Sequence, residues 1–335
     1  MMDQTPSQDA SVAAAVAMLR ETVAPDWEYG WDAAGQTPMQ VAGQAPSQVA
    51  GQAPSQVAGQ APAPTITAIV LGSGLGSLAD KIESPVIVPF GDIPGFAHST
   101  ASGHRGQLVF GTLGGEPLIA MAGRLHRYEG WTDDQVTFPI RVMQGLGARR
   151  LIASNAAGGV NPKLAVGDIV VLCDQINWLH ARRQIAVPDK TVPDKTVPSE
   201  TGAASAGFTI GFPAGRRGQL FDPQLVSLAL SAAREGGFVA VQGTYLATLG
   251  PTYETRAEYR MMRRIGADVV GMSTAGEVLM AANLGMSVLA LSIVSNVADP
   301  DRAKVADHAE VLEAGDAAAA KLEGIVRRIL SGHRV

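Results

Sequence analysis

The chain has 335 residues, of which 46% are hydrophobic, and a net charge of −5. This length and apolar content are sufficient for one large domain with a sizeable core. The negative charge excludes a broad cationic surface of the kind that binds nucleic acid or anionic lipid, so any bound phosphate has to be held locally.

Cys173 is the only cysteine, which excludes an intrachain disulfide and favours a reducing compartment. It lies in the apolar run 169–173, and this context predicts a buried, structural thiol. The N-terminus lacks a basic segment followed by an apolar core, and no stretch approaches the roughly 18 apolar residues of a membrane span. We therefore expect a cytoplasmic protein without membrane or nucleic-acid partners.

The first 64 residues are predicted to form a helical segment and a linker that precede the main domain. Apolar residues recur at helical spacing over residues 8–22, within a helical segment at 1–24. A Val-Ala-Gly-Gln-Ala-Pro repeat then starts at Val41, Val49 and Val57. Pro, Gly and Gln at this density cannot bury enough apolar surface to offset the entropy of ordering. We expect a disordered linker over residues 25–64.

Residues 65–335 have the pattern of a single α/β domain with a central mixed β-sheet flanked by helices on both faces, because strand-like and helical segments interleave. The predicted strands cover residues 66–71, 85–89, 107–112, 117–122, 150–153, 168–173, 239–246, 268–270 and 287–294. The predicted helices cover residues 133–146, 223–235, 254–265, 275–284 and 306–330. An irregular insertion at about 182–218, with a duplicated Val-Pro-Asp-Lys-Thr, is expected at the surface.

Two segments rich in small residues follow predicted strands and suggest an anion site. The turn Gly-Ser-Gly-Leu-Gly-Ser at 72–77 has Ser77 where a dinucleotide-binding fingerprint needs its third glycine, so a dehydrogenase is the weaker interpretation. Ser73 instead offers a hydroxyl before a helix expected near Leu75, where N–H groups favour an anion. Residues 154–162 are expected to form a loop whose backbone N–H groups are also bare.

A segment bracketed by glycines carries a guanidinium, an imidazole and a phenol. Arg124, His126 and Tyr128 alternate, so an extended segment points all three to one side. The arginine fork suits phosphate oxygens, and the histidine adds a donor and a proton reservoir near neutral pH. His104, in a loop between glycines, is a further donor. No histidine pair has metal-ligand spacing, so no metal is expected.

Three later segments supply groups suited to a flat, polar ligand. Tyr253 can stack on a ring and Glu254 can accept hydrogen bonds, although capping of the next helix is the alternative for Glu254. Met272 and Ser273 end a short strand, and Ser273 is also a candidate N-cap. Asn296 ends the strongest apolar strand, at the sheet edge where ligands of open α/β folds collect. Its amide can read a purine edge carrying a carbonyl and a ring nitrogen.

Together these segments resemble the trimeric, 6-oxopurine-specific class of purine nucleoside phosphorylases over residues 66–330. The resemblance is carried, in the family's order and at compatible spacing, by residues 72–78, 123–130, 155–162, 251–255, 271–274 and 295–296. It implies the nucleoside phosphorylase fold, a homotrimer, and a pentosyltransferase of purine salvage. The implied reaction is the reversible phosphorolysis of inosine, guanosine and their deoxy analogues, with inorganic phosphate as co-substrate and no cofactor.

The resemblance also implies roles for individual residues. It implies a phosphate held by Ser73, His104, Arg124, His126, the backbone at Ala156 and Ser273. It implies a nucleoside contacted by Tyr128, Tyr253, Glu254, Val270, Met272, Asn296 and His308, with His308 reaching the 5′-hydroxyl. The catalytic roles fall to Asn296, Glu254 and His126. No protein nucleophile is needed, because the site aligns phosphate with the sugar and stabilises the departing base.

The segment after Asn177 departs from the family pattern. Ala181 stands where many members offer an aromatic side chain to the neighbouring subunit's ribose site. Trp178, His180 and Phe208 are candidates to replace it, and the sequence leaves the choice open.

Two other functions remain as alternatives. Methylthioadenosine phosphorylase shares the implied fold and phosphate site but reads a 6-amino base, whereas Asn296 and His308 favour an oxopurine nucleoside. A non-catalytic nucleoside-binding homologue, with the altered loop and repeat-rich arm serving assembly, is disfavoured because every aligned phosphate position is retained.

Overall fold

The computed structural model describes residues 7–23, 27, 65–72, 75–99, 104–179, 219–301 and 308–332. The repeats within residues 25–64 and the insertion at about 182–218 lie outside the described residues. So do Ser73, His180, Ala181, Phe208 and the side chain of His308.

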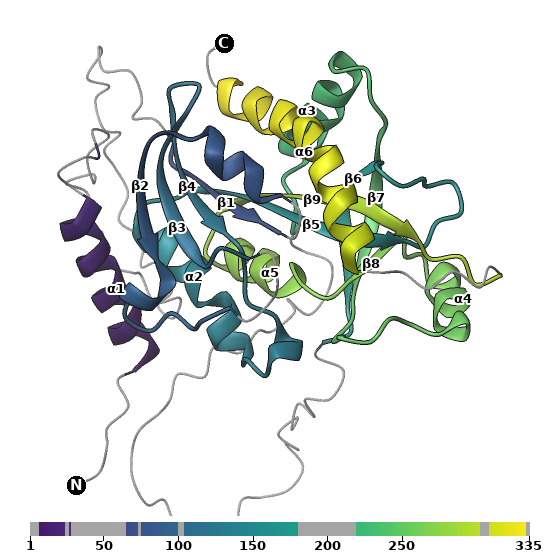
Figure 1. Ribbon diagram of the computed structural model, residues 1–335, viewed down its shortest axis with the longest axis horizontal. Helices are drawn as coiled ribbons and strands as arrows, with labels where there is room; N and C mark the ends of the chain where they lie inside the picture. The colour runs from purple at the N-terminus through teal and green to yellow at the C-terminus, as the bar shows by residue number, and fades with distance from the viewer. Residues whose placement is uncertain are drawn as a thin grey trace, which may run out of the picture.

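A mixed β-sheet of nine strands forms the centre of the described part of the chain (Figure 1). The strands are β1 (Thr67–Leu71), β2 (Glu83–Pro89), β3 (Gln107–Leu113), β4 (Glu116–Ala122), β5 (Arg150–Gly159), β6 (Ile169–Asn177), β7 (Ala240–Ala247), β8 (Val269–Gly271) and β9 (Ser287–Val297). Their order is β2-β3-β4-β1-β5-β8-β7-β6-β9, and β9 also pairs with β5. The last five strands therefore close into a ring.

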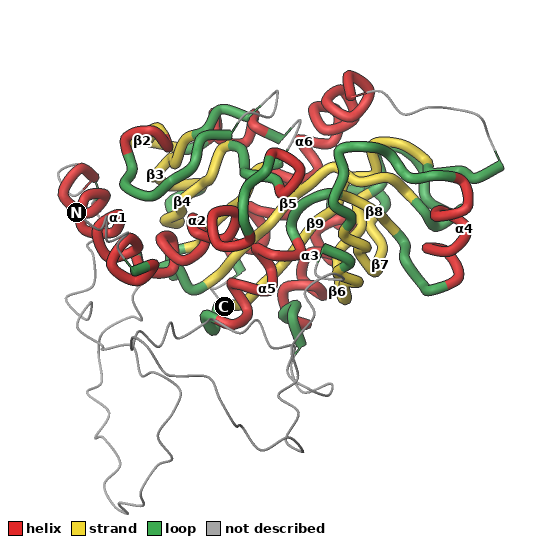
Figure 2. The backbone as a smooth tube through the Cα atoms, turned by 90° about the horizontal axis from the view of Figure 1, so that it is seen from below, coloured by secondary structure: helices red, strands yellow, loops and turns green. Residues whose placement is uncertain are grey.

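Helices cover this sheet on both sides. They are α1 (Gln8–Val23), α2 (Asp133–Gly145), α3 (Pro223–Glu235), α4 (Arg256–Arg264), α5 (Ala275–Asn283) and α6 (His308–Ser331), with 3₁₀ turns η1 (Gly76–Lys81), η2 (Phe90–Asp92) and η3 (Arg127–Glu129). α2 packs against α5 and α3 packs against α6. α1 and α4 lie at opposite ends of the molecule (Figures 1 and 2). The predicted α/β class is confirmed.

Three helices begin at side chains that cap their free N–H groups. The Thr132 hydroxyl accepts from the third residue of α2, and the Thr255 hydroxyl accepts from the third residue of α4, each in a capping box. The Asp222 carboxylate accepts from two N–H groups of α3. These local signals fix where the helices start, so the loops before them have defined paths toward the sheet.

Parallel pairing brings the carboxyl ends of β1, β5 and β9 to one edge of the sheet. Ile69 of β1 faces Ile152 of β5, and Ile152 faces Leu289 of β9. All three side chains are at most 2% exposed. Strands buried on both faces need apolar residues at every position, which is why they appear in the sequence as continuous apolar runs.

The prediction that residues 154–162 form a loop is wrong for residues 154–159. β5 continues to Gly159, because β9 extends alongside it and pairs with Ala156 and Ala157. Small residues permit this close pairing: a Cβ on Gly159 would lie 3.0 Å from Cγ1 of Val294. The last residue of β5 that pairs with β1 is Ala153, so residues 154–157 have no partner in β1 on that edge of the strand.

The buried position predicted for Cys173 is also wrong, because its side chain is exposed. The register between β6 and β7 shifts between Leu172 and Asp174, so Cys173 is the extra residue of a bulge and turns outward. Partial burial and the charges of Asp174 and Asp268 raise the pKa of the thiol. The helix expected near Leu75 is the 3₁₀ turn η1.

The predicted N-terminal helix docks on the main domain through its apolar face. Ala15, Leu19 and Val23 of α1 are fully buried, and Arg20 donates to the carbonyl of Gly145 in α2 at 3.1 Å. Trp27, which falls within the predicted linker, is 6% exposed and packs edge-on against Phe110.

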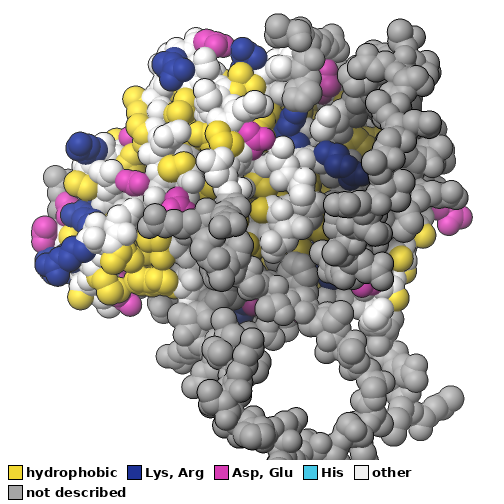
Figure 3. Space-filling model, turned by 180° about the vertical axis from the view of Figure 1, so that it is seen from behind, with side chains coloured by type: hydrophobic (Ala, Val, Ile, Leu, Met, Phe, Trp, Pro, Cys, Tyr) yellow, Lys and Arg dark blue, Asp and Glu magenta, His cyan; other side chains and the backbone are white. Residues whose placement is uncertain are grey.

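Charged side chains lie scattered over the visible face of Figure 3, where Lys and Arg alternate with Asp and Glu. Among the described residues, none of the helices combines the length and the apolar content needed to cross a bilayer.

Candidate active site

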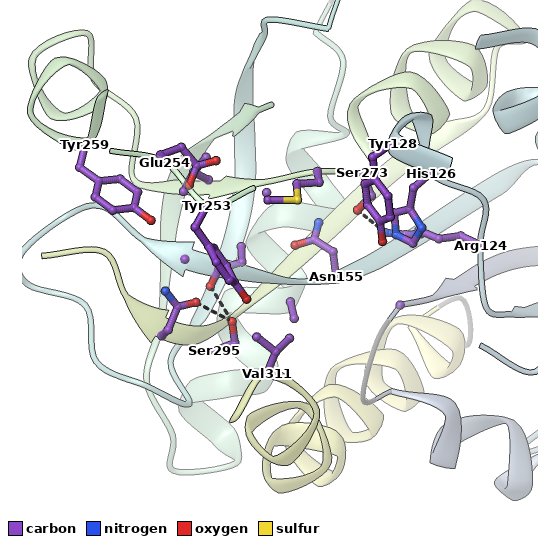
Figure 4. Close-up of a pocket in the computed structure, with 18 residues that line it drawn as sticks. Arg124, His126, Tyr128, Asn155, Tyr253, Glu254, Tyr259, Ser273, Ser295 and Val311 are labelled. Atoms are coloured by element: carbon purple, nitrogen blue, oxygen red, sulfur yellow. Dashed lines mark hydrogen bonds between the residues drawn. The ribbon is translucent and has the colours of Figure 1, made fainter. Parts of the chain in front are cut away.

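A pocket opens where β1, β5, β8 and β9 end, and segments far apart in the sequence meet there (Figure 4). Ten of the predicted site residues line it: Arg124, His126, Tyr128, Ala156, Tyr253, Glu254, Val270, Met272, Ser273 and Asn296. In Figure 4 the side chains of Arg124, His126 and Ser273 gather at one end, and Glu254 lies toward the other. Asn155 points into the space between them.

Arg124 is a buried cation at the first end. Its side chain is 1% exposed, and Nη2 lies 3.3 Å from a carboxylate oxygen of Glu277, which is equally buried. Burial raises the pKa of the Glu277 carboxyl, and the Arg124 charge acts in the opposite direction. Nη1 donates to the hydroxyls of Ser273 and Thr274, each at 2.8 Å. A guanidinium held in this way presents a fixed positive charge to the pocket.

Tyr245 fixes the backbone that carries Ser273. Its phenol donates to the Ser273 carbonyl at 3.0 Å and accepts from the Ser273 N–H at 3.2 Å. The side chain is fully buried, which raises its pKa to about 12. A Cβ on Gly271 would lie 2.5 Å from the phenol oxygen, so only glycine fits there. The turn after β8 is therefore held from behind.

His126 and Tyr128 stand beside Arg124 in a tight turn. The extended geometry predicted for this segment stops at His126, because η3 begins at the next residue. Glu129 Oε1 lies 2.9 Å from Nδ1 of His126 and accepts the backbone N–H of the same residue at 2.8 Å. Since a carboxylate only accepts, Nδ1 carries a proton in this contact. The Tyr128 ring stacks on the imidazole with centroids 4.6 Å apart.

His104 stands behind these groups and is not among the residues that line the pocket. Its Nδ1 accepts the backbone N–H of Arg124 at 2.5 Å, and its ring meets the ring of His126 edge-on at 5.2 Å. Burial lowers the pKa of His104 to about 3, and the positive charges of His126 and Arg124 act in the same direction. The imidazole is therefore neutral near pH 7, with its proton on Nε2.

The other end of the pocket holds an oriented carboxylate. The Thr248 hydroxyl donates to Glu254 Oε1 at 2.9 Å, and the Thr248 N–H donates to the carbonyl of Gly271 at 2.8 Å. Tyr259, in α4, lies beside this carboxylate, where burial and the Glu254 charge raise the pKa of its phenol. Tyr253 is 42% exposed at the pocket mouth.

The Asn296 amide is also oriented by a neighbour. The Ser295 hydroxyl, whose residue is 4% exposed, lies 3.0 Å from Asn296 Oδ1 and 3.3 Å from the carbonyl oxygen of Ala157, and its one proton orients the amide when it is donated to the nearer Oδ1. The amide nitrogen is then the group that can donate to a ligand. A Cβ on Gly158 would lie 3.4 Å from that nitrogen, so the glycine leaves it room.

Two predicted site residues cannot be placed in the pocket. Ser73 and the side chain of His308 lie outside the described residues. The backbone of His308 begins α6, and Val311, one turn later, lines the pocket. Trp178, one candidate for the aromatic role, packs against a separate apolar cluster around Val160 and is not among the lining residues.

Several residues of the site were not predicted. Tyr259 of α4 and Val311 of α6 line the pocket. The helical spacing of these segments does not indicate which of their residues point toward a ligand. Thr248, Tyr245 and Glu277 act from behind the lining, and their partners lie far from them in the sequence. Among the residues that the structure describes, no three His, Cys, Asp or Glu side chains are grouped to hold a metal ion.

Comparison with known proteins identifies relatives over most of the chain. The model of the phosphorylase superfamily matches residues 66–331. Purine nucleoside phosphorylase 1 of Bacillus subtilis is 42% identical over 263 residues, covering 78% of this chain and 90% of that protein. The Rattus norvegicus purine nucleoside phosphorylase is 41% identical over 263 residues, covering 77% and 86%. A Schistosoma purine nucleoside phosphorylase, solved with hypoxanthine, superposes with a TM-score of 0.67 at 36% identity, covering 81% of this chain and 92% of that one.

Proposed function

This chain belongs to the phosphorylase superfamily, and from its purine nucleoside phosphorylase relatives we propose that it catalyses the reversible phosphorolysis of 6-oxopurine nucleosides. The substrates are inosine, guanosine and their deoxy analogues, and the products are the free purine and (deoxy)ribose 1-phosphate. The enzyme is therefore a pentosyltransferase. One observation carries the proposal: a single pocket has a buried cation at one end and an oriented carboxylate and amide elsewhere on its wall.

The cationic end suits inorganic phosphate. Because Arg124 is almost fully buried, water screens its charge little and its attraction for a dianion is strong. Ser273 and His126 lie beside it and can donate further hydrogen bonds. In this proposal Ser73 and the backbone at Ala156 complete the phosphate site, and His104, which is not among the lining residues, contributes from beside His126.

The other end suits a purine that carries a 6-oxo group. The Glu254 carboxylate can accept the N1–H of hypoxanthine or guanine, a proton that a 6-aminopurine lacks. The Asn296 amide nitrogen can donate to the ring nitrogen N7. Tyr253 can stack on the ring. Val270 lines the base pocket. Ribose then lies between the two ends, over Met272 and near Tyr128 and His308.

The chemistry follows from this alignment. A phosphate oxygen forms a bond to C1′ while the C1′–N9 bond breaks, and the electron pair of the broken bond leaves with the purine. The proton of hydrogen phosphate ends on the purine, so atoms and charge balance. Positive charge develops on the ribose ring beside the phosphate, and negative charge develops on the base, where Asn296 donates. The protein contributes alignment and charge stabilisation rather than a nucleophile.

The test is the phosphate-dependent release of hypoxanthine from inosine. The parent protein is expected to release hypoxanthine only when phosphate is present, and to turn over methylthioadenosine more slowly. Asn296→Ala and His126→Ala are expected to lower kcat/KM by about 100-fold, the scale of one hydrogen bond to a charged group in the transition state.

Two outcomes would contradict the proposal. Faster turnover of methylthioadenosine would assign the chain to methylthioadenosine phosphorylase. Binding of inosine without release of base would make it a nucleoside-binding protein.

We also propose a homotrimer in the cytoplasm that serves purine salvage, with inorganic phosphate as co-substrate and no cofactor. The family resemblance supports the trimer and the purine salvage role. A mass measured by light scattering tests the trimer. Full activity in a chelator-treated, cofactor-free preparation that contains phosphate tests the proposal that phosphate is the co-substrate and that no cofactor is needed.

A further inference from the structure

Thr274 is buried beside the cationic end of the pocket but has no role in the reaction described above. It is 2% exposed, and its hydroxyl oxygen has three polar neighbours. Nη1 of Arg124 and Nδ2 of Asn155 both donate to it at 2.8 Å. The Ser273 hydroxyl lies 3.1 Å away, and either of these two oxygens could be the donor.

The count of protons decides the direction of that last contact. A hydroxyl oxygen has two lone pairs and one proton. At Thr274 both lone pairs are taken by Arg124 and Asn155, so the proton goes to Ser273. Ser273 already accepts from Arg124 at 2.8 Å, so both of its lone pairs are then filled. The proton of Ser273 is then the part of this hydroxyl that remains to donate, and the acceptors it can reach are the phenol oxygen of Tyr245 and a bound ligand.

The backbone at Thr274 is held in a conformation that threonine rarely adopts. Its φ is +68° and its ψ is −45°, which is the region of the tight γ-turn. The N–H of Ala275 closes the turn on the carbonyl of Ser273 at 2.7 Å. A β-branched residue at positive φ is strained, and such strain is kept where the surrounding structure and the function require it. Glycine would occupy this backbone without strain, so a specific use of the threonine side chain accounts for its presence.

On the premise of the proposed function, we infer that Thr274 is a positioning residue for the phosphate co-substrate. Its hydroxyl aligns Arg124 and Asn155 and forces Ser273 to present its proton, rather than a lone pair, to the anion. Phosphate oxygens at neutral pH mostly accept hydrogen bonds, so a hydroxyl with its proton directed outward attracts them and one with its lone pair outward repels them.

The test is the affinity of the protein for inorganic phosphate, measured by titration calorimetry on the full chain. Thr274→Val keeps the side-chain shape without the hydroxyl, and Thr274→Gly removes the hydroxyl and relieves the turn. Both are expected to weaken phosphate binding by about 30-fold, the scale of one hydrogen bond to a charged group. Thr274→Ser keeps the hydroxyl and is expected to remain within about threefold of the parent.

Thr137→Val is the matched control. Thr137 is also 2% exposed, but its hydroxyl donates to the carbonyl of Asp133 within α2 and lines no part of the pocket. It is expected to keep the parent's phosphate affinity. In steady-state assays at saturating phosphate, the Thr274 variants are expected to keep the KM for inosine within about threefold of the parent. A merely structural defect would instead raise the KM for inosine as well as the KM for phosphate.

The outcomes separate this inference from the proposed function. Phosphate affinity within threefold of the parent in both Thr274→Val and Thr274→Gly would overturn it, as would an equal rise in the KM for inosine. A parent that binds no phosphate would also overturn it. A parent that binds phosphate but releases no hypoxanthine would overturn the proposed function alone, because the calorimetric comparison needs no turnover.

Discussion

Removing the imidazole of His104 is expected to flatten the pH dependence of stability. Burial lowers the pKa of this group to about 3 from an ordinary value of 6.5. Between about pH 6.5 and pH 3 the imidazole is therefore protonated in the unfolded chain and neutral in the folded chain. The stability that the neutral imidazole contributes is fully present above pH 6.5 and is lost progressively as the pH falls from 6.5 towards 3. In His104→Asn the amide oxygen can take the place of Nδ1 and accept the Arg124 N–H without titrating.

The magnitude follows from the size of the shift. At pH 5.0 the unfolded imidazole is almost fully protonated and the folded one is almost fully neutral. The 1.5 pH units below the ordinary value then correspond to about 2 kcal/mol, at about 1.4 kcal/mol per unit. Between pH 7.5 and pH 5.0 the parent should lose about 2 kcal/mol more unfolding free energy than His104→Asn loses.

The assay is urea unfolding followed by tryptophan fluorescence at pH 7.5 and pH 5.0, in phosphate-free buffers and at one protein concentration. Any constant cost of the substitution cancels, because only the difference between the two pH values is compared. His98→Asn, at an exposed histidine, is the matched control and should follow the parent. Parent and His104→Asn losing the same free energy within about 0.5 kcal/mol would refute the reasoning.

Three further predictions concern stability and exposure. Glu277→Gln is expected to lower the unfolding free energy by about 3 kcal/mol, because it leaves Arg124 buried without a countercharge; a loss under about 1 kcal/mol in urea unfolding would contradict this. Tyr245→Phe is expected to cost about 1–3 kcal/mol, because the Ser273 N–H and carbonyl lose their partner; thermal unfolding at the parent's temperature would argue against it. Cys173→Ser is expected to stay within about 0.5 kcal/mol of the parent, and one thiol per folded chain should react with a water-soluble thiol reagent; a folded chain that resists labelling would show that the bulge does not expose Cys173.

Much of the fold was predictable because its signals are local. Continuous apolar runs predicted β1, β9 and the first part of β5, and helical spacing predicted α2, α3 and α4, to within a few residues. The failures have a common cause. Residues 154–159 contain small and polar side chains that look like a loop, yet they pair with β9 as a strand. Cys173 turns outward because of a bulge in the pairing with β7. Pairing between distant strands leaves no local trace in either segment.

Part of the candidate site was likewise predictable from the sequence, and part of it was not. Side chains with distinctive chemistry at strand ends, such as Arg124, Glu254 and Asn296, were found from sequence, since strand ends at one edge of a sheet converge. The groups that orient them were not found. Thr248 holds Glu254, and Glu277 faces Arg124, across sequence separations that periodicity cannot bridge.

The sequence by itself determined the α/β class, the order of the elements and the chemical types of the groups in the pocket, because these depend on short-range pattern and residue identity. Only the tertiary structure decided how these groups are charged, oriented and shielded. His104 is neutral because partial burial and the neighbouring positive charges lower its pKa, and Ser273 directs its proton outward because of the oxygens and nitrogens around Thr274. Burial and hydrogen-bond direction arise from contacts between segments that are remote along the chain, and they exist only once the chain has folded.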